Sequence, residues 1–276
     1  MRRFACFIAV TMTSAFALNA QAAELAPHRA IYDLTVTESR EAAGVNSGNG
    51  RLVYEFRRKD CKGFELVYRQ VMKVKPSEGA ESMIDFRATT FEDDGAQLLI
   101  FENSNTVNGT VDTALKGKAA RDGGQIAVTI EKPESRDVAL PENVLFPTEH
   151  LKRIIKAADE GRNLLEAKVF DGSGKADSAG QTLAMIGKPV ASGKGDNNAV
   201  LAKMSNVRHW PISISYFEPA AAAVEQTPKF IFGADLYENG VAVNLRLDYG
   251  SFVVAGKLVG LALLPNDSKM ACSTPQ

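Results

Sequence analysis

Apolar and polar residues alternate with period two over much of the chain. The run 64–75 shows this best, because one face takes Phe64, Leu66, Tyr68, Met72 and Val74 while the other takes Glu65, Arg69, Lys73 and Lys75. Successive side chains of a strand point to opposite faces, so the pattern predicts strands with one buried and one solvated face, as in antiparallel sheets. The same alternation marks residues 32–37, 126–130, 212–216 and 241–249.

Turn dipeptides separate these runs and fit tight hairpins: Asn49-Gly50, Asn108-Gly109, Asp122-Gly123, Asp171-Gly172 and Asn239-Gly240. Two Gly-rich polar stretches, 171–180 and 187–198, predict loops. Counted this way, the chain has roughly a dozen strands, and we expect a mainly β protein with one domain over residues 23–276.

One segment has helical periodicity instead. Leu151, Ile154, Ile155 and Ala158 follow the i, i+3, i+4, i+7 spacing of one helix face, which predicts a helix over 147–160 with these four residues against the sheet. Pro147 suits the first turn, and Gly161, just after the segment, suits the C-terminal cap. Residues 218–228 are Ala-rich and bounded by prolines, and they are compatible with a short helix or a loop.

The N-terminal segment is typical of a cleavable export signal. Arg2 and Arg3 precede an uncharged apolar run, and Ala20-Gln21-Ala22 supplies the small-x-small motif of a signal peptidase site. We expect residues 1–22 to be removed, with cleavage after Ala23 as the alternative, and the protein to be periplasmic. The apolar run is shorter than the ~20 residues that a membrane-spanning helix requires, so we expect no membrane span in the mature chain.

Charge and cysteine content narrow the function classes. Residues 1–22 hold two of the 32 basic residues and none of the 33 acidic ones, so the mature chain is nearly neutral and has no basic cluster for nucleic acid. Two cysteines remain after cleavage, Cys61 and Cys272. In an oxidising compartment they are expected to form a disulfide, and the alternative is two unpaired thiols.

Catalytic signatures are absent from the sequence: it has no nucleophile elbow, phosphate-binding loop, dinucleotide-binding motif or zinc-protease motif. His28, His150 and His209 lie far from any second histidine or cysteine at ligand spacing, so each is interpreted as structural. The alternating polar residues 171–177 resemble a calcium loop only faintly, because Lys175 interrupts them and the bidentate glutamate is missing. We expect no catalytic residue, cofactor or metal.

The segment 210–217, which contains the single tryptophan Trp210, has two interpretations. The first is a core strand. The second is an aromatic lining for a ligand cleft on a curved sheet, since curved sheets leave an inner surface open to apolar ligands.

An ordered set of short motifs resembles the EipB family of periplasmic cell-envelope integrity proteins of alphaproteobacteria. The motifs span the mature chain in order: Phe146-Pro147-Thr148-Glu149-His150-Leu151, Asp171-Gly172-Ser173, Trp210-Pro211-Ile212-Ser213-Ile214-Ser215-Tyr216-Phe217, Leu236-Tyr237-Glu238-Asn239-Gly240 and Leu247-Asp248-Tyr249-Gly250-Ser251-Phe252. The resemblance implies a β-spiral, an open barrel-like antiparallel sheet curled around a central helix, with Cys61 and Cys272 at the positions of the family disulfide. The Gly-rich residues 178–198 depart from the family pattern.

The resemblance also implies a function without known enzymatic activity: maintenance of the cell envelope under stress. The main hypothesis is therefore a non-enzymatic protein that binds another periplasmic protein, as yet unidentified, with repeat proteins among the candidates. The alternative is a LolA-like carrier that holds a lipid or acyl chain in the concave face of the sheet, an idea that rests on likeness of fold to the lipoprotein carriers of the Lol system. A hydrolase of envelope polymers is the third hypothesis.

Overall fold

The protein is described by a computed structural model that covers residues 24–40, 44–59, 62–174, 176–190, 200–218 and 227–265. Its strands are β1 (His28–Ser39), β2 (Val45–Lys59), β3 (Gly63–Pro76), β4 (Ser82–Asp93), β5 (Leu98–Val107), β6 (Thr110–Asp122), β7 (Gln125–Lys132), β8 (Arg136–Pro141), β9 (Leu164–Val169), β10 (Gly180–Ile186), β11 (His209–Phe217), β12 (Phe230–Tyr237), β13 (Ala242–Asp248) and β14 (Phe252–Leu263). One helix, α1 (Pro147–Asp159), joins β8 to β9, and a short 3₁₀ turn, η2 (Ala202–Met204), precedes β11.

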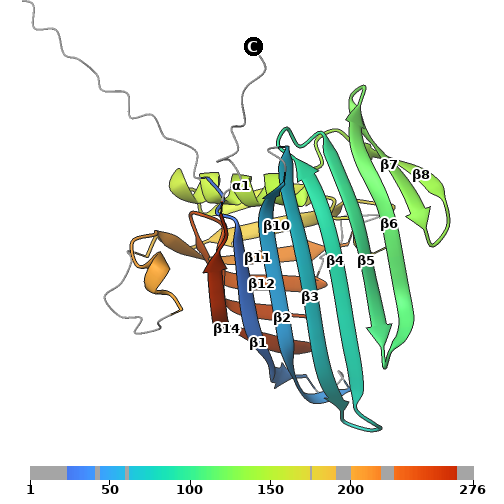
Figure 1. Ribbon diagram of the computed structural model, residues 1–276, viewed down its shortest axis with the longest axis vertical. Coiled ribbons are helices and arrows are strands. Elements are labelled where there is room, and N and C mark those ends of the chain that lie inside the picture. Colours follow the sequence, from blue (N-terminus) through green and yellow to red (C-terminus); the bar gives the residue numbers. More distant parts are fainter. Residues whose placement is uncertain are drawn as a thin grey trace, which may run out of the picture.

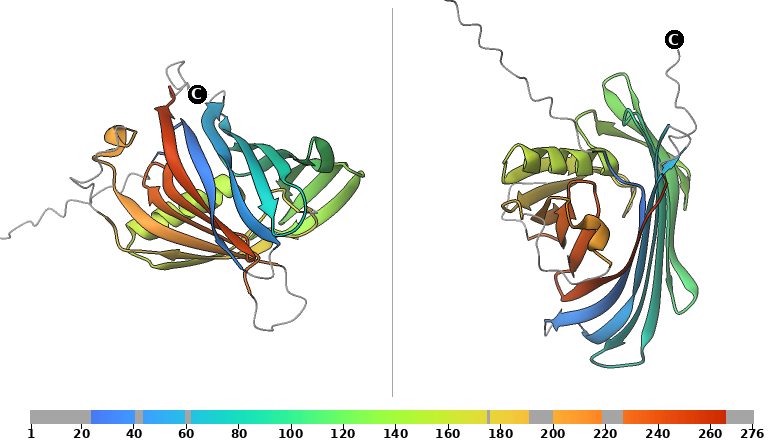
Figure 2. Two further views of the ribbon diagram at one scale, coloured as in Figure 1. Left: turned by 90° about the horizontal axis from the view of Figure 1, so that it is seen from below. Right: turned by 60° about the vertical axis from the view of Figure 1, so that its left-hand side comes forward.

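All these strands form one antiparallel sheet in the order β8-β7-β6-β5-β4-β3-β2-β1-β14-β13-β12-β11-β10-β9 (Figure 1). The sheet curls strongly, and α1 lies across one end of it (Figures 1 and 2). This confirms the mainly β, curled antiparallel architecture with a helix. The alternation predicted from the sequence is visible in β3, where Phe64, Met72 and Val74 are buried and Arg69 and Lys73 are exposed.

The two ends of the sheet meet without a continuous ladder between β8 and β9. After β8, Leu145 forms a single parallel bridge with Val169 at the end of β9. The chain then packs Phe170 edge-on against Phe101 of β5, with ring centroids 5.6 Å apart, and Gly172 accepts a hydrogen bond from the Asn103 side chain at 2.8 Å. The predicted Asp171-Gly172 turn therefore forms part of a longer connection from β9 to β10, and this connection packs across the gap between the two ends of the sheet.

The N-terminus of α1 is held by a strand from across the sheet. Its N-cap residue, Phe146, offers no side-chain hydrogen bond. Instead the carboxylate of Glu92, in β4, accepts the backbone N–H groups of Thr148 and Glu149 at 2.6 and 2.8 Å. At the other end Gly161 has a φ of 72°, and the N–H of Arg162 donates to Ala157, as in a helix cap with a left-handed residue. The helix ends one residue before the predicted boundary.

Two sequence expectations need correction. Asn49-Gly50 is not a turn: it lies inside β2, where Gly50 pairs with Met72 and a Cβ would lie 2.1 Å from the Val71 carbonyl oxygen. The glycine permits a close backbone approach rather than a reversal. Strand β10 lies between the two predicted loops and was not expected, because its alternation is short. The described strands number fourteen, close to the predicted count of roughly a dozen.

Candidate functional site: the concave face

The concave face of the sheet contains an apolar cavity of about 280 Å³. Strands from both halves of the sheet line it, and α1 contributes only Leu151. The helix therefore leaves part of the concave face unfilled. Aliphatic side chains form much of the wall: Leu52, Ile212, Ile214, Leu236, Leu245 and Leu247.

Aromatic side chains complete the wall of this cavity, which we call the inner cavity. Their polar groups form hydrogen bonds with neighbouring residues or stay uncharged. His28 stacks on Tyr54 with ring centroids 5.4 Å apart, and its Nδ1 lies 2.7 Å from the Ala26 carbonyl oxygen. Burial lowers the pKa of His28, which favours the neutral ring. Tyr32 donates its hydroxyl to the Ala242 carbonyl at 2.7 Å, and burial raises the pKa of Tyr32 and Tyr54, so both phenols stay neutral.

A second cavity, of about 430 Å³, adjoins the first toward the rim of the sheet. It is lined by Met72 and Val74 of β3, by side chains of β4, β5 and β6, and by Phe252 of β14. The two cavities share Tyr68 and Tyr249. Both volumes are near the small end of the ~300–1,000 Å³ range of small-molecule sites.

Tyr68, Gln70 and Tyr249 form a hydrogen-bonded bridge between the cavities. The Tyr68 hydroxyl donates to Oε1 of Gln70, and Nε2 of Gln70 donates to the Tyr249 hydroxyl at 3.3 Å. Tyr68 and Gln70 belong to β3, whereas Tyr249 follows β13, so the bridge joins two walls of the concave face. Aromatic rings continue from it along the rim: Tyr249 lies 5.1 Å from Phe230 and 5.0 Å from Phe252, measured between centroids.

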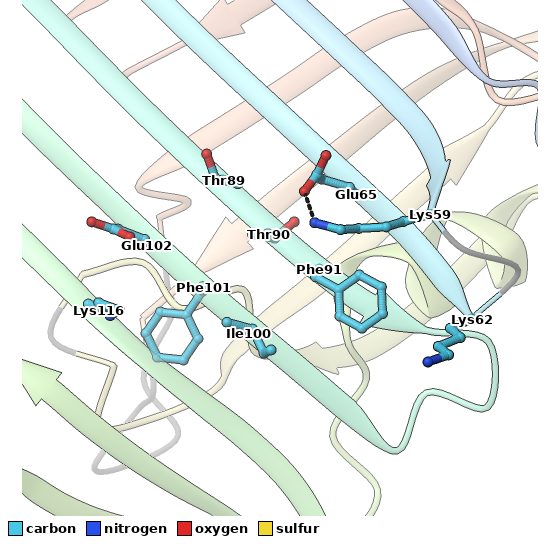
Figure 3. Close-up of a pocket in the computed structure, with 10 residues that line it drawn as sticks. All are labelled: Lys59, Lys62, Glu65, Thr89, Thr90, Phe91, Ile100, Phe101, Glu102 and Lys116. Carbon is cyan, nitrogen blue, oxygen red and sulfur yellow. Dashed lines mark hydrogen bonds and ion pairs between the residues drawn. The ribbon is translucent and has the colours of Figure 1, made fainter. Parts of the chain in front are cut away.

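The convex face carries a different hollow, of about 340 Å³, between β3 and β6 (Figure 3). Phe91 and Ile100 give it an apolar floor, and the Ile100 residue is 43% exposed. Charges of both signs surround it, among them the ion pair of Lys59 and Glu65 at 2.6 Å (Figure 3).

The structure places the predicted helix residues as follows. Ile154, Ile155 and Ala158 are buried in the main core, while Leu151 is half-buried at the inner cavity. His150 is also buried, with Nε2 3.4 Å from the Thr182 hydroxyl, and burial lowers its pKa to about 4.

The other predicted residues separate into core and cavity. Trp210 is a core residue, 1% exposed, as the first interpretation of this segment expects, and Ile212 and Ile214 of the same strand line the inner cavity. The aromatic lining of a ligand cleft stays a prediction, because no aromatic side chain of this segment lines that cavity. His209 lies against Tyr237 with centroids 4.7 Å apart. Cys61, Cys272 and the export signal lie outside the described residues.

The bridge residues Gln70 and Tyr249 were not predicted from the sequence as functional residues. Gln70 occupies an apolar-side position of β3, and this break in the alternation was the available signal. In the described ranges no group of three histidine, cysteine, aspartate or glutamate side chains is arranged to hold a metal ion. No helix there is long and apolar enough to cross a membrane.

Comparisons with known proteins identify relatives over most of the chain. The model of a family described as EipB-like matches residues 19–265. The cell envelope integrity protein EipB of Brucella abortus is 34% identical over 255 residues, which are 92% of this chain and 90% of that protein. A crystal structure of a β-barrel-like protein of a domain of unknown function, also from Brucella abortus, has a TM-score of 0.82 and 33% identity, and the match covers 88% of this chain and all of that one. The chain therefore belongs to the EipB-like family.

Proposed function

We propose that this protein maintains the integrity of the cell envelope by binding an apolar chain, such as a lipid or lipoprotein acyl group, in its concave face. The observation that carries the proposal is the inner cavity, whose walls are almost wholly apolar and which the helix leaves unfilled. Concave apolar sites of this kind are the usual locations of small-molecule ligands. The envelope role is supported by membership of the EipB-like family and by the name of the Brucella abortus relative.

Native mass spectrometry of protein purified from periplasm without detergent tests this proposal. We expect a co-purifying apolar ligand that Ala242→Trp abolishes, because Ala242 lines the inner cavity and an indole there would fill it. Ala127→Trp is the matched control, since Ala127 is exposed on β7. Retention of the ligand by Ala242→Trp would contradict the proposal. A wild-type protein that carries no ligand and binds no apolar probe in a competition assay would also contradict it.

We also propose that the protein functions in the periplasm. The export signal in residues 1–22 and the envelope role of the named relative support it. N-terminal sequencing of the protein from a periplasmic fraction should begin at Ala23. A chain that retains Met1, or that fractionates with the cytoplasm, would refute this location.

A second proposal concerns a periplasmic protein partner, and it rests on the convex hollow. Exposed Ile100 lies beside charges of both signs, as in the centre and rim of many protein interfaces (Figure 3). Cross-linking in cells should yield an adduct that Ile100→Glu removes and that Met185→Glu retains, because Met185 is also exposed, at 50%, but lies on β10. Equal loss in both variants, or in neither, would remove the hollow as the docking site.

A further inference from the structure

The two cavities and the bridge between them point to a particular ligand chemistry. Among the residues that line either cavity in the described part of the chain, none is a lysine, arginine, aspartate or glutamate. The single imidazole, His28, is held neutral by burial. An ionised group bound in these cavities would therefore be desolvated without an opposite charge, which is strongly unfavourable.

Polar groups are nevertheless present where the cavities join. Gln70 supplies an amide and is half-buried, while Tyr249 supplies a hydroxyl and is 36% exposed. In the bridge Tyr249 acts as acceptor, so its own O–H remains to donate to a carbonyl oxygen. The amide N–H of Gln70 also contacts the Met72 sulfur at 3.3 Å, a weak acceptor that a carbonyl oxygen can replace.

We propose, on the basis of the proposed function, that the concave face binds an uncharged acyl ester or amide, with its chain in the inner cavity and its carbonyl bound by Gln70 and Tyr249. The ligand then exchanges the Gln70–Tyr249 hydrogen bond for bonds to its own carbonyl oxygen. Opening that bond also joins the two cavities, so the bridge serves as the passage for the chain. The site discriminates against free fatty acids, because their carboxylate would lie unpaired at the same place.

Competition with a fluorescent apolar probe, N-phenyl-1-naphthylamine, tests this chemistry in the mature protein at pH 8. Methyl dodecanoate and dodecanoate have the same chain and differ in charge. We expect the ester to displace the probe at a concentration at least about tenfold lower than the acid. Gln70→Leu and Tyr249→Phe should each weaken ester binding about fivefold, the worth of one hydrogen bond, when the ester affinity is expressed relative to the affinity of the same variant for the probe.

The matched control is Gln181→Leu, since Gln181 is an exposed glutamine in strand β10 that lines neither cavity. It should bind ester and acid as the wild type does. Tyr249→Phe removes one oxygen atom and preserves the ring packing, so it keeps the test decisive even where Gln70→Leu perturbs the fold.

The outcomes separate this inference from the proposed function. Failure of the wild type to bind the probe, the ester and the acid would overturn both. Binding of ester and acid with equal affinity would overturn the inference and leave an apolar-chain site intact. An ester preference that survives undiminished in both bridge variants would remove Gln70 and Tyr249 as the carbonyl-binding residues.

Discussion

The contact of Glu92 with the start of α1 gives the sharpest stability prediction. Glu92 is 3% exposed, and its two oxygens accept the N–H groups of Thr148 and Glu149. These are backbone donors that a helix leaves unpaired at its first turn, and Phe146 offers no side-chain cap. Glu92→Ala removes both acceptors at once, and each buried donor left unsatisfied costs ~1–3 kcal/mol. At about pH 5, where Glu92 still contributes most of its stabilisation, we expect the free energy of unfolding to fall by about 2–4 kcal/mol.

The same residue should also shape the pH dependence of stability. Burial raises the pKa of Glu92 from 4.5 to about 7, against the opposing effects of the two backbone hydrogen bonds and of Lys152. The folded protein thus holds a proton that the unfolded chain releases above pH 4.5. This contribution to stability is complete below about pH 4.5 and is lost as the pH rises to 7, in total ~3 kcal/mol.

Urea unfolding monitored by circular dichroism between pH 4 and 8 measures both effects. Glu92→Gln should flatten the decline of stability between pH 4.5 and 7, because glutamine cannot ionise. Glu131→Ala is the control, since Glu131 is exposed and its ion pair with Lys116 should contribute at most ~1 kcal/mol. A Glu92→Ala protein within ~0.5 kcal/mol of the wild type would show that the helix does not depend on this carboxylate.

Three further predictions test other parts of the protein. Gly172→Ala should destabilise the protein by roughly 2–4 kcal/mol, because φ is +71° and a Cβ would lie 2.4 Å from the Phe101 ring. Gly174→Ala is the control and should cost only ~1 kcal/mol, because the space around Gly174 is open. Equal melting points for the two variants would refute tight packing of this connection against Phe101. Ile155→Asp should cost ~3–5 kcal/mol in urea unfolding through an unpaired buried charge, and an unchanged midpoint would place this helix face in solvent. Cys272→Ser should lower the free energy of unfolding by ~2–5 kcal/mol and leave the β circular-dichroism spectrum unchanged, because it removes the expected disulfide with Cys61. Thiol titration of the unfolded, unreduced wild type should find no free thiol, and two free thiols would refute the disulfide.

The elements that sequence reasoning predicted well are those governed by local periodicity. Alternation in β3 follows directly from one buried and one solvated face, and the spacing of Ile154, Ile155 and Ala158 follows from the helical repeat. Asn108-Gly109 does form the predicted hairpin turn, with φ of 52° and 81°. The prediction of a turn at Asn49-Gly50 was wrong, because glycine also suits a close contact between two strands. Whether such a contact forms depends on the partner strand and not on the dipeptide.

The cavities could not be predicted in the same way, because they depend on contacts between distant segments. Gln70 and Tyr249 are separated by 179 residues, and their hydrogen bond exists only after the sheet has curled. Sequence patterns indicate which face of a strand is buried, but they do not indicate whether the buried face meets a side chain or a space. The sequence therefore does not indicate how far the helix fills the concavity. In the structure the helix lies across one end of the sheet, and Leu151 is the helix residue that lines the inner cavity.

The segment Leu247-Asp248-Tyr249-Gly250 shows how a short motif can serve such a distant site. Asp248 accepts a bidentate pair of hydrogen bonds from Arg40, both 3.0 Å long, and this guanidinium is the main cause that lowers the Asp248 pKa to about 2. The N–H of Gly250 donates to the same carboxylate at 2.9 Å, with a φ of 80° that favours glycine. The Asp248 carboxylate thus holds the backbone on both sides of Tyr249, and the Tyr249 ring packs against Phe230 and Phe252, so the position of the ring does not depend on the bond to Gln70 alone. A ligand can then break the bond to Gln70 without displacing the ring, which is the behaviour that a selective passage to the inner cavity requires.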